Sequence, residues 1–489
     1  MKDSVPDLRV GLTFDDVLLV PKFSGVKSRK DVDTTTWFSR RIKLEIPIVS
    51  SNMDTVTESA MAIAVARLGG IGVIHRFLSI EHEVAEVLKV KRSEGVVIED
   101  PVTLGPGESV RDAWRVIKER SVGGIVIVDR SSRVLGLLTR RDIILEDDLS
   151  RRVEEVMTRR KDLITAHKGV SLDRAKRILH DNRIEKLPLL DGKGRLAGLI
   201  TSKDILKRKQ FPGATKDAKG RLSVAAAVGV KTDYLARART LFDAGADALV
   251  VDIAHGHSSY AADAVKAIKK EIGDVEVVAG NVATSKGASD LIRAGADAVK
   301  VGVGSGSICV TRIVAGSGVP QLTAIMDSAE GAKGSGVPII GDGGIRDPGD
   351  VTKALAAGAS TVMIGSLFAG TEESPGPTVL REGVRYKLTR GMASLAATVD
   401  RRFRETRDAR EEEVIEQAIE ESVPEGVEGL IPYRGTVEEV VRQLVGGVRS
   451  GMSYSGARNI PELRKRAEFM RITSAGRKES LPHDIKRVI

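Results

Sequence analysis

Short runs of Val, Ile and Ala recur along this chain, and each run ends in a Gly, Asn, Asp or His. A stretch with helical spacing of apolar residues follows each run, and a Gly-Ala or Gly-Gly pair often closes the unit, so the pattern predicts βα repeats. The runs that we interpret as strands are 46–51, 71–75, 223–228, 248–253, 275–279, 298–303, 337–341 and 361–365. Eight βα units predict an α/β fold, a (β/α)8 TIM barrel.

The second and third predicted strands are separated by about 150 residues, far more than a βα loop needs. We therefore expect a separate domain in this interval, and we assign residues 94–208 to it. Residues 1–93 and 209–489 then form the barrel, with a flap at about residues 385–430 and a further C-terminal segment.

The expected insertion contains an internal repeat. Residues 136–143 (GLLTRRDI) recur as residues 198–205 (GLITSKDI), and each copy follows a β-rich run. This pattern resembles a tandem pair of CBS domains, a regulatory module whose cleft often binds an adenine or guanine nucleotide. The repeated Thr-x-x-Asp also suits a helix cap, and capping is compatible with ligand binding.

Residues 395–430 are rich in Arg and Glu, with only scattered apolar positions. Such a segment is not expected in a core. Two interpretations stay open, a mobile lid over an active site and a solvated helical excursion.

The distribution of charged residues along the chain limits the kinds of ligand that we expect. The chain has 76 Lys and Arg against 67 Asp and Glu, a formal net charge of +9. The two signs are interleaved, as in the segment 410–413 (REEE), instead of gathering in one basic block. We therefore expect small phosphorylated anions as ligands and do not expect nucleic acid.

A single cysteine, Cys309, excludes an intramolecular disulfide, and the first ten residues have no apolar segment typical of a signal peptide. Both features favour the cytoplasm. The chain has no apolar run of about 18 residues, so we expect no membrane span.

Glycine-rich loops follow the last two predicted strands, at 341–345 (GDGGI) and at Gly365-Ser366. Barrel enzymes commonly bind phosphate there, because glycine lets the backbone amides approach the anion closely. Asp342 suits hydrogen bonds from a ribose diol. Turn geometry alone also explains single glycines, but their presence after both of these strands favours a phosphate site.

The loop after the sixth strand contains Cys309 among several glycines, in the segment 302–311 (GVGSGSICVT). A lone cysteine is often a small buried apolar residue. Its place beside glycines at the catalytic end of a barrel instead favours a nucleophile. Thr311 suits a hydrogen bond to a reacting water or a helix cap.

Strands four and five end near Asp252 and Asn281, whose side chains suit ribose and amide recognition in a dinucleotide. His255 and His257 have a spacing found in metal sites, but no cysteine or carboxylate cluster nearby completes such a site, so we do not expect zinc.

Five segments taken together resemble the inosine monophosphate dehydrogenase and guanosine monophosphate reductase superfamily. They are residues 12–19 (LTFDDVLL), 51–56 (SNMDTV), 302–316 (GVGSGSICVTRIVAG), 342–344 (DGG) and 391–394 (GMAS). The resemblance covers the whole chain and implies a barrel with an inserted CBS pair, assembled as a homotetramer or an octamer.

The resemblance also implies a chemistry. In the dehydrogenases a cysteine attacks C2 of the hypoxanthine ring of IMP, hydride passes to NAD, and the thioimidate is hydrolysed to xanthosine monophosphate. Cys309 takes the place of that nucleophile. By the same resemblance the substrate-binding residues are Ser51, Met53, Ser307, Asp342, Gly343, Gly344, Gly365, Ser366, Gly391, Met392 and Glu428.

NAD would face Asp252, Asn281 and Gly302. A potassium ion would bind in the loop that contains the nucleophile, at a site shared between subunits. Its ligands would be carbonyls of Gly304, Gly306 and Cys309 together with Glu479, Ser480 and Leu481 of the partner subunit.

The family's flap has an Asp-Arg-Tyr motif whose arginine helps to activate water. Here the motif is Asp400-Arg401-Arg402, so Arg401 is kept and the tyrosine is replaced. Arginine stays protonated in water. Either a closed flap stabilises its neutral form, or Thr311 and Glu428 share the task.

Two further positions depart from the family pattern. Thr389 stands where a nucleotide-contacting tyrosine is usual, and Ala393 stands where glycine is usual.

The reductases share the barrel, the cysteine and the threonine, so other features must discriminate. Reductases place a glutamate directly after the Gly-Met-Ser-Ser motif, where this chain has Leu395, and they generally lack a long flap. Residues 423–429 (VPEGVEG) resemble the dehydrogenases. We therefore favour a dehydrogenase, with a CBS-containing GMP reductase as the alternative and a non-catalytic nucleotide sensor as the third hypothesis.

Overall fold

The structure is a computed structural model that describes residues 8–94, 97–99, 101–120, 122–203, 205, 210–231, 233–405, 415, 419 and 423–482. The chain forms two compact units. One comprises Met1–Lys91, Gly213–Asp217 and Leu222–Ile489, and the other comprises Arg92–Pro212 and Ala218–Arg221.

The larger unit is a closed barrel of eight parallel strands in the order β13-β14-β15-β16-β17-β18-β4-β5. The strands are β4 (Ile48–Ser50), β5 (Ile71–Ile74), β13 (Val224–Val228), β14 (Ala248–Asp252), β15 (Glu276–Val282), β16 (Ala298–Val301), β17 (Ile339–Asp342) and β18 (Thr361–Ile364). Each lies within or overlaps one of the predicted runs, so the predicted (β/α)8 barrel is confirmed.

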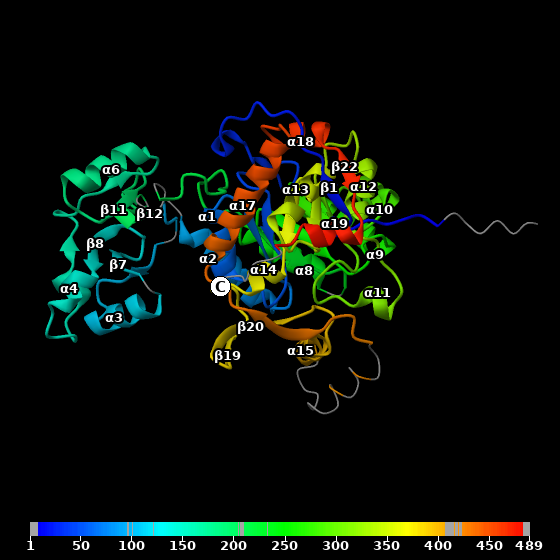
Figure 1. Ribbon diagram of the computed structural model, residues 1–489. Coiled ribbons are helices and arrows are strands. Elements are labelled where there is room, and N and C mark those ends of the chain that lie inside the picture. Colours follow the sequence, from blue (N-terminus) through cyan, green and yellow to red (C-terminus); the bar gives the residue numbers. More distant parts are fainter. Residues whose placement is uncertain are drawn as a thin grey trace, which may run out of the picture. The chain divides into compact units, whose positions relative to one another are not determined.

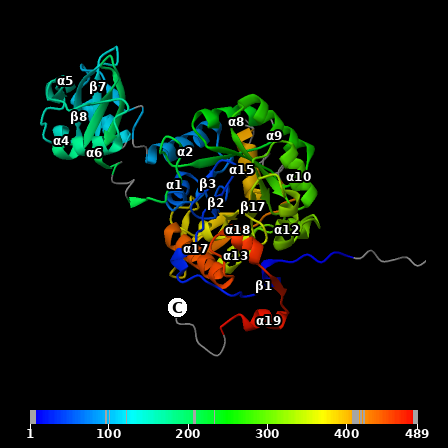
Figure 2. The ribbon, with the colours of Figure 1, turned by 90° about the horizontal axis from the view of Figure 1, so that it is seen from above.

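Helices surround these strands, as Figure 2 shows from above. They are α1 (Ser59–Arg67), α2 (Ile80–Ser93), α8 (Tyr234–Asp243), α9 (Ser259–Ile272), α10 (Ser285–Arg293), α12 (Gln321–Gly331), α13 (Pro348–Ala356) and α17 (Val437–Tyr454). The short helices α11 (Thr311–Val314) and α14 (Ser366–Ala369) follow strands β16 and β18. The strands read as continuous Val, Ile and Ala runs because both of their faces are covered.

A hairpin of β2 (Thr36–Trp37) and β3 (Lys43–Leu44) closes the amino end of the barrel. Phe38 and Leu44 are fully buried among barrel residues such as Val49, and the Arg40 N–H donates to the carbonyl of Asp297, just before β16. One end of the barrel is therefore filled by apolar side chains, and the carboxyl end is left for a site.

The smaller unit contains two similar halves. The first has β6 (Thr103–Leu104), α3 (Val110–Glu119), β7 (Gly124–Val128), β8 (Val134–Thr139), α4 (Arg140–Ile144), α5 (Val153–Val156) and β9 (Thr158–Arg159). The second has β10 (Ala166–His167), α6 (Leu172–Asp181), β11 (Lys186–Leu190) and β12 (Leu196–Thr201). Thr139 and Asp142 form a capping box on α4, while Asp204, its counterpart in the repeat, lies outside the described residues.

The C-terminal region adds a small antiparallel sheet and a helix to the barrel (Figure 1). Strands β19 (Thr378–Arg381), β20 (Val384–Arg390) and β21 (Glu428–Pro432) form an antiparallel sheet, and α15 (Leu395–Glu405) follows β20. Much of the flap between α15 and residue 423 lies outside the described residues.

The remaining elements are η1 (Phe14–Asp16), β1 (Val17–Leu19), η2 (Arg29–Asp31), α18 (Ile460–Arg466), β22 (Phe469–Arg471) and α19 (Ser474–Glu479). Strands β1 and β22 pair, which joins residues 17–19 to residues 469–471. Within the described ranges, no helix has both the length and the apolar character to cross a membrane.

Candidate active site

The loop that contains Cys309 follows β16 and is fastened to the end of β17. Gly302 begins this loop with a φ of +155°, and a Cβ added there would lie 2.0 Å from the carbonyl oxygen of Asp342. The Ser305 hydroxyl donates to the same carbonyl at 2.9 Å, and the side-chain amide of Gln321 donates to it at 3.0 Å. These contacts place Cys309 at the carboxyl end of the barrel, where barrel enzymes have their active sites.

Cys309 begins a chain of three side chains joined by hydrogen bonds. Its sulfur lies 3.1 Å from the hydroxyl oxygen of Thr311, and that hydroxyl donates to Oε2 of Glu425 at 2.7 Å. The main chain supports the same pairing, because the Val310 N–H donates to the carbonyl of Glu425 at 2.9 Å. A threonine hydroxyl has one hydrogen, so while it donates to the carboxylate its oxygen accepts from the thiol. The arrangement gives a proton a route from a nucleophile to a carboxylate.

Thr311 contacts Glu425 and not Glu428 in this structure, and the shared role expected of Thr311 and Glu428 stays a prediction. The carboxylate of Glu428 accepts from the Ala396 N–H at 3.2 Å, in the first turn of α15. Both glutamates lie in one short segment, and its sequence alone does not show which of them faces Thr311. The deciding contact is a β-bridge between Cys309 and Gly426, which brings Glu425 beside the threonine.

The polar side chains predicted at the ends of strands four, five and seven meet around Lys300, a residue of β16 that the sequence analysis missed. Lys300 Nζ lies 2.8 Å from Oδ1 of Asp252 and 2.6 Å from Oδ2 of Asp342. Asn281 Nδ2 donates to the same Oδ2 of Asp342 at 3.0 Å. Burial raises the pKa of Asp252, but the charge and hydrogen bond of Lys300, with the charge of Arg76, outweigh burial and hold that pKa below its ordinary value.

Glycines of the predicted phosphate site lie against neighbouring loops. A Cβ at Gly343, whose φ is +93°, would meet the hydroxyl of Ser305 at 2.5 Å. A Cβ at Gly365 would lie 3.4 Å from the sulfur of Met53 and 3.9 Å from Cβ of Ser51. The loops after β4, β16, β17 and β18 therefore approach one another at the carboxyl end.

The segment after β20 reaches the same region. A Cβ at Gly391 would lie 3.3 Å from the carbonyl oxygen of Ile308, and the Asp54 N–H donates to the sulfur of Met392 at 3.4 Å. The structure thus gathers at this end of the barrel, in the strand ends and in the segments that follow them, Ser51, Met53, Ser307, Asp342, Gly343, Gly344, Gly365, Ser366, Gly391 and Met392. Nucleotide binding by these residues stays a prediction.

Ion pairs connect the flap to the loop after β4. Arg390, at the end of β20, lies 2.6 Å from Oδ2 of Asp54 and 2.7 Å from Oδ2 of Asp400 in α15. Arg401 and Arg402 follow in the same helix, and their side chains lie outside the described part of the structure. The role expected of Arg401 therefore stays a prediction.

The two departures from the family pattern have packing partners. The hydroxyl oxygens of Thr389 and Thr55 lie 3.1 Å apart in a buried contact. The carbonyl of Ala393 accepts from the Glu425 N–H at 3.0 Å. The Ala393 backbone thereby helps to hold Glu425.

The cation ligands expected by resemblance lie in two separate segments. Gly304 has a φ of +75°, and the Gly306 carbonyl accepts from the Cys309 N–H at 3.1 Å. Glu479 ends α19, and Ser480 is its C-cap. A meeting of these segments across two subunits stays a prediction. Over the described residues no group of three or more His, Cys, Asp or Glu is arranged to hold a metal ion.

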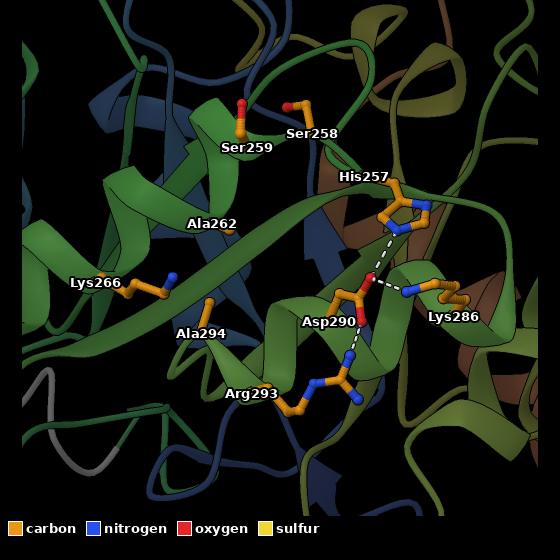
Figure 3. Close-up of a pocket in the computed structure, with 9 residues that line it drawn as sticks. All are labelled: His257, Ser258, Ser259, Ala262, Lys266, Lys286, Asp290, Arg293 and Ala294. Atoms are coloured by element: carbon orange, nitrogen blue, oxygen red, sulfur yellow. Dashed lines mark hydrogen bonds and ion pairs between the residues drawn. The ribbon is translucent and has the colours of Figure 1, made fainter.

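A pocket of about 470 Å³ lies between α9 and α10, and it is separate from the residues expected to bind nucleotide or NAD (Figure 3). Asp290 is its centre: Oδ2 lies 2.9 Å from Nε2 of His257 and 2.8 Å from Nζ of Lys286, and Arg293 also pairs with this carboxylate. Hydrogen bonds from Lys286 and His257 lower the pKa of Asp290 to about 2. His257, just before α9, therefore links that helix to α10 through its contact with Asp290.

Comparison with known proteins shows the family that this chain resembles. The family model described as "IMP dehydrogenase / GMP reductase domain" matches residues 11–483. A relative from Nitrosopumilus maritimus, named inosine-5'-monophosphate dehydrogenase, is 54% identical over 98% of this chain and 99% of its own. One of the same name from Aquifex aeolicus is 53% identical over 98% and 96%.

Among solved structures, a variant of the GMP reductase of Trypanosoma brucei, in complex with guanosine 5'-monophosphate, superposes with a TM-score of 0.91. It is 44% identical, and the match covers 98% of this chain and 99% of that one. With the sequence and the fold in agreement, the chain belongs to the IMP dehydrogenase / GMP reductase family.

Proposed function

We propose that this protein oxidises inosine 5'-monophosphate to xanthosine 5'-monophosphate with NAD, in the synthesis of guanine nucleotides. The observation that carries the proposal is the chain from Cys309 through Thr311 to Glu425 at the mouth of the barrel. The two relatives named inosine-5'-monophosphate dehydrogenase, 54% and 53% identical over nearly the whole chain, support it.

The reaction has two halves. First, the Cys309 thiol loses its proton and its sulfur bonds to C2 of the purine, and the hydrogen on C2 leaves as hydride. NAD, when bound, accepts that hydride. Water then adds to C2 of the thioimidate and the carbon–sulfur bond breaks, which releases xanthosine monophosphate and restores the thiol. Glu425, which accepts a hydrogen bond from Thr311, is proposed to take a proton from the attacking water.

Arg401 is proposed to assist the attacking water, as the resemblance implies. Glu428 keeps its proposed role in substrate binding. In the structure its carboxylate lies beside α15 and accepts from the Ala396 N–H. These two assignments rest on the family pattern, whereas the role of Glu425 rests on its hydrogen bond.

NAD is proposed to bind at the end of β15. Asn281 Oδ1 is buried and has no hydrogen-bond partner among the described residues, so it offers an acceptor for the carboxamide N–H of nicotinamide. Asn281 Nδ2 donates to the Gly302 carbonyl at 2.8 Å, which fixes the orientation of that amide. Asp252 is the acceptor proposed for the ribose.

Potassium is proposed at the carbonyls of Gly304, Gly306 and Cys309, because a glycine-rich turn presents the neutral oxygen ligands that suit such a cation. The homotetramer or octamer is proposed with it, since Glu479, Ser480 and Leu481 of the partner subunit would complete the site. The smaller unit is proposed to be a CBS pair that binds an adenine or guanine nucleotide.

GMP reductase is the second candidate, and one observation favours it. The Trypanosoma brucei reductase matches this chain over 98% of its length, so an inserted unit does not separate the two activities. Two observations argue against it. Leu395 stands at the position of the reductase glutamate, and Glu425, in the C-terminal part of the flap, supplies a carboxylate to Thr311.

Purified protein distinguishes these hypotheses. One sample receives IMP and NAD, another receives GMP and NADPH, and nicotinamide absorbance is followed in both, with Cys309→Ala as the inactive control. We expect absorbance to rise in the first sample alone. Turnover in the second alone would refute the dehydrogenase. Turnover in neither, with a folded protein, would favour the nucleotide sensor.

A further inference from the structure

Lys300 is a buried cation at the active-site end of the barrel. Neither the sequence motifs nor the proposed reaction explains why it is there. It lies in β16, between Val299 and Val301, and its side chain is 3% exposed. Its ammonium group contacts the carboxylates of Asp252 and Asp342 at 2.8 and 2.6 Å. These are the two residues that we assign to different ligands, the first to the dinucleotide and the second to the nucleotide.

We propose that Lys300 is a positioning residue that fixes both carboxylates at once, so that one buried cation sets the geometry of the NAD site and of the IMP site. The names of the two ligands rest on the proposed function. The bridge itself rests on the contacts in β14, β16 and β17.

Charge explains why a cation is needed there. Two carboxylates held within reach of one ammonium group repel each other, and burial further disfavours the charged form of Asp252. Burial alone would lower the pKa of Lys300, but Asp252 and Asp342 reverse that effect and raise it above its ordinary value, so the lysine stays charged. Arg76 is the other cation that acts on Asp252.

Geometry explains why the position matters. Oδ2 of Asp342 accepts from both Lys300 and Asn281, at 2.6 and 3.0 Å. The two donors orient the carboxylate, and within the described residues its Oδ1 has no protein donor. That oxygen is therefore available to accept hydrogen bonds from a ribose hydroxyl. Without Lys300 the carboxylate loses one of the two contacts that aim it.

The chain offers a matched control in Lys91. This lysine is also buried, with a side chain 2% exposed, and it also bridges two aspartates, Asp217 at 3.1 Å and Asp247 at 2.6 Å. Asp247 precedes β14, whereas Asp252 ends it. Lys91 is thus a similar buried bridge at the opposite end of the same strand, away from the proposed chemistry.

The test compares Lys300→Met, Lys300→Arg and Lys91→Met by steady-state kinetics over a range of pH. We expect Lys300→Met to raise KM for IMP and KM for NAD by about tenfold each, the effect of 1.4 kcal/mol. Loss of the lysine charge should also raise the pKa of Asp252. The acid limb of kcat/KM for NAD should therefore move to higher pH. Lys300→Arg should restore the acid limb, because it keeps the charge.

Lys91→Met should lower the thermal unfolding midpoint and leave both KM values and the pH profile near those of the wild type. Unchanged KM values and pH profile in a folded Lys300→Met variant would overturn the inference. If Lys300→Met does not fold, Lys300→Arg decides, because the longer guanidinium displaces the carboxylates and must still raise both KM values. A wild-type enzyme that turns over GMP with NADPH instead would refute the proposed function alone, and the same variants would then be compared with that pair.

Discussion

Thr311 donates its hydroxyl hydrogen to Oε2 of Glu425 across 2.7 Å. The bond joins the first residue of α11 to the C-terminal part of the flap, more than a hundred positions along the chain. Because Cys309 Sγ lies 3.1 Å from the same hydroxyl, the nucleophile and the flap region share one hydrogen-bonded chain. A change at the Glu425 end of that chain is expected to affect the second half of the reaction.

Glu425→Gln is expected to slow hydrolysis of the thioimidate by about 10²-fold or more, the usual contribution of a positioned acid or base. The amide keeps the size of the side chain but is a far weaker proton acceptor. Hydride transfer precedes this step, so rapid mixing should show a normal burst of NADH followed by a slow steady state.

Glu428→Gln is the matched control, because its carboxylate lies three residues away and accepts from the Ala396 N–H instead. We expect that variant to keep its steady-state rate within a few-fold, with any larger effect on the KM for IMP. A stalled steady state in Glu428→Gln together with a normal one in Glu425→Gln would reverse the assignment.

Arg401→Ala is expected to behave like Glu425→Gln, with hydride transfer largely intact and hydrolysis slowed. The covalent thioimidate should then accumulate, and intact-protein mass spectrometry after mixing with IMP and NAD should detect it on Cys309. Cys309→Ala should show neither burst nor adduct. Equal loss of hydride transfer and hydrolysis in Arg401→Ala would contradict the role of this residue.

The sequence predicted the barrel well because its signals are local. Runs such as that around β14 are apolar on both faces, and a polar residue such as Asp252 marks the carboxyl end where the strand leaves the core. The loops after the strands could therefore be placed at one end of the molecule from the sequence alone, and Cys309 and Asp342 with them.

The side-chain contacts inside the site depend on how distant segments of the chain align in the fold. They were therefore harder to predict from the sequence. Glu425 and Glu428 have similar neighbours, and the bridge between Cys309 and Gly426 decides which one meets Thr311. Lys300 did leave a signal, since a charged residue between two valines of a buried strand needs partners. Those partners lie on β14 and β17, and the barrel must close before they come within reach.

Asp400→Asn is expected to loosen α15, because it removes one of the two carboxylates paired with Arg390 while keeping the pair with Asp54. We expect faster amide hydrogen exchange in residues 395–405, and a lower rate of hydrolysis since the helix includes Arg401. Glu438→Gln, which breaks an exposed pair with Arg442 on α17 at 2.8 Å, is the control for loss of a surface charge pair. Unchanged exchange in Asp400→Asn would show that the ion pair does not hold the helix.

Gly302→Ala is expected to destabilise the protein and to disable the site together. An added Cβ would lie 2.0 Å from the carbonyl oxygen of Asp342, and the φ of +155° is one that side chains rarely adopt. Strain and overpacking of this kind cost about 2–5 kcal/mol. Because the same carbonyl anchors Ser305 and Gln321, its displacement should also shift the Cys309 loop.

Thermal unfolding and the NADH burst measure the two effects separately. Gly429→Ala is the control, since a Cβ there meets no atom within 4 Å, and its midpoint and burst should match those of the wild type. If Gly302→Ala unfolds at the wild-type temperature and gives a full burst, the tight contact between the loop and β17 does not position Cys309.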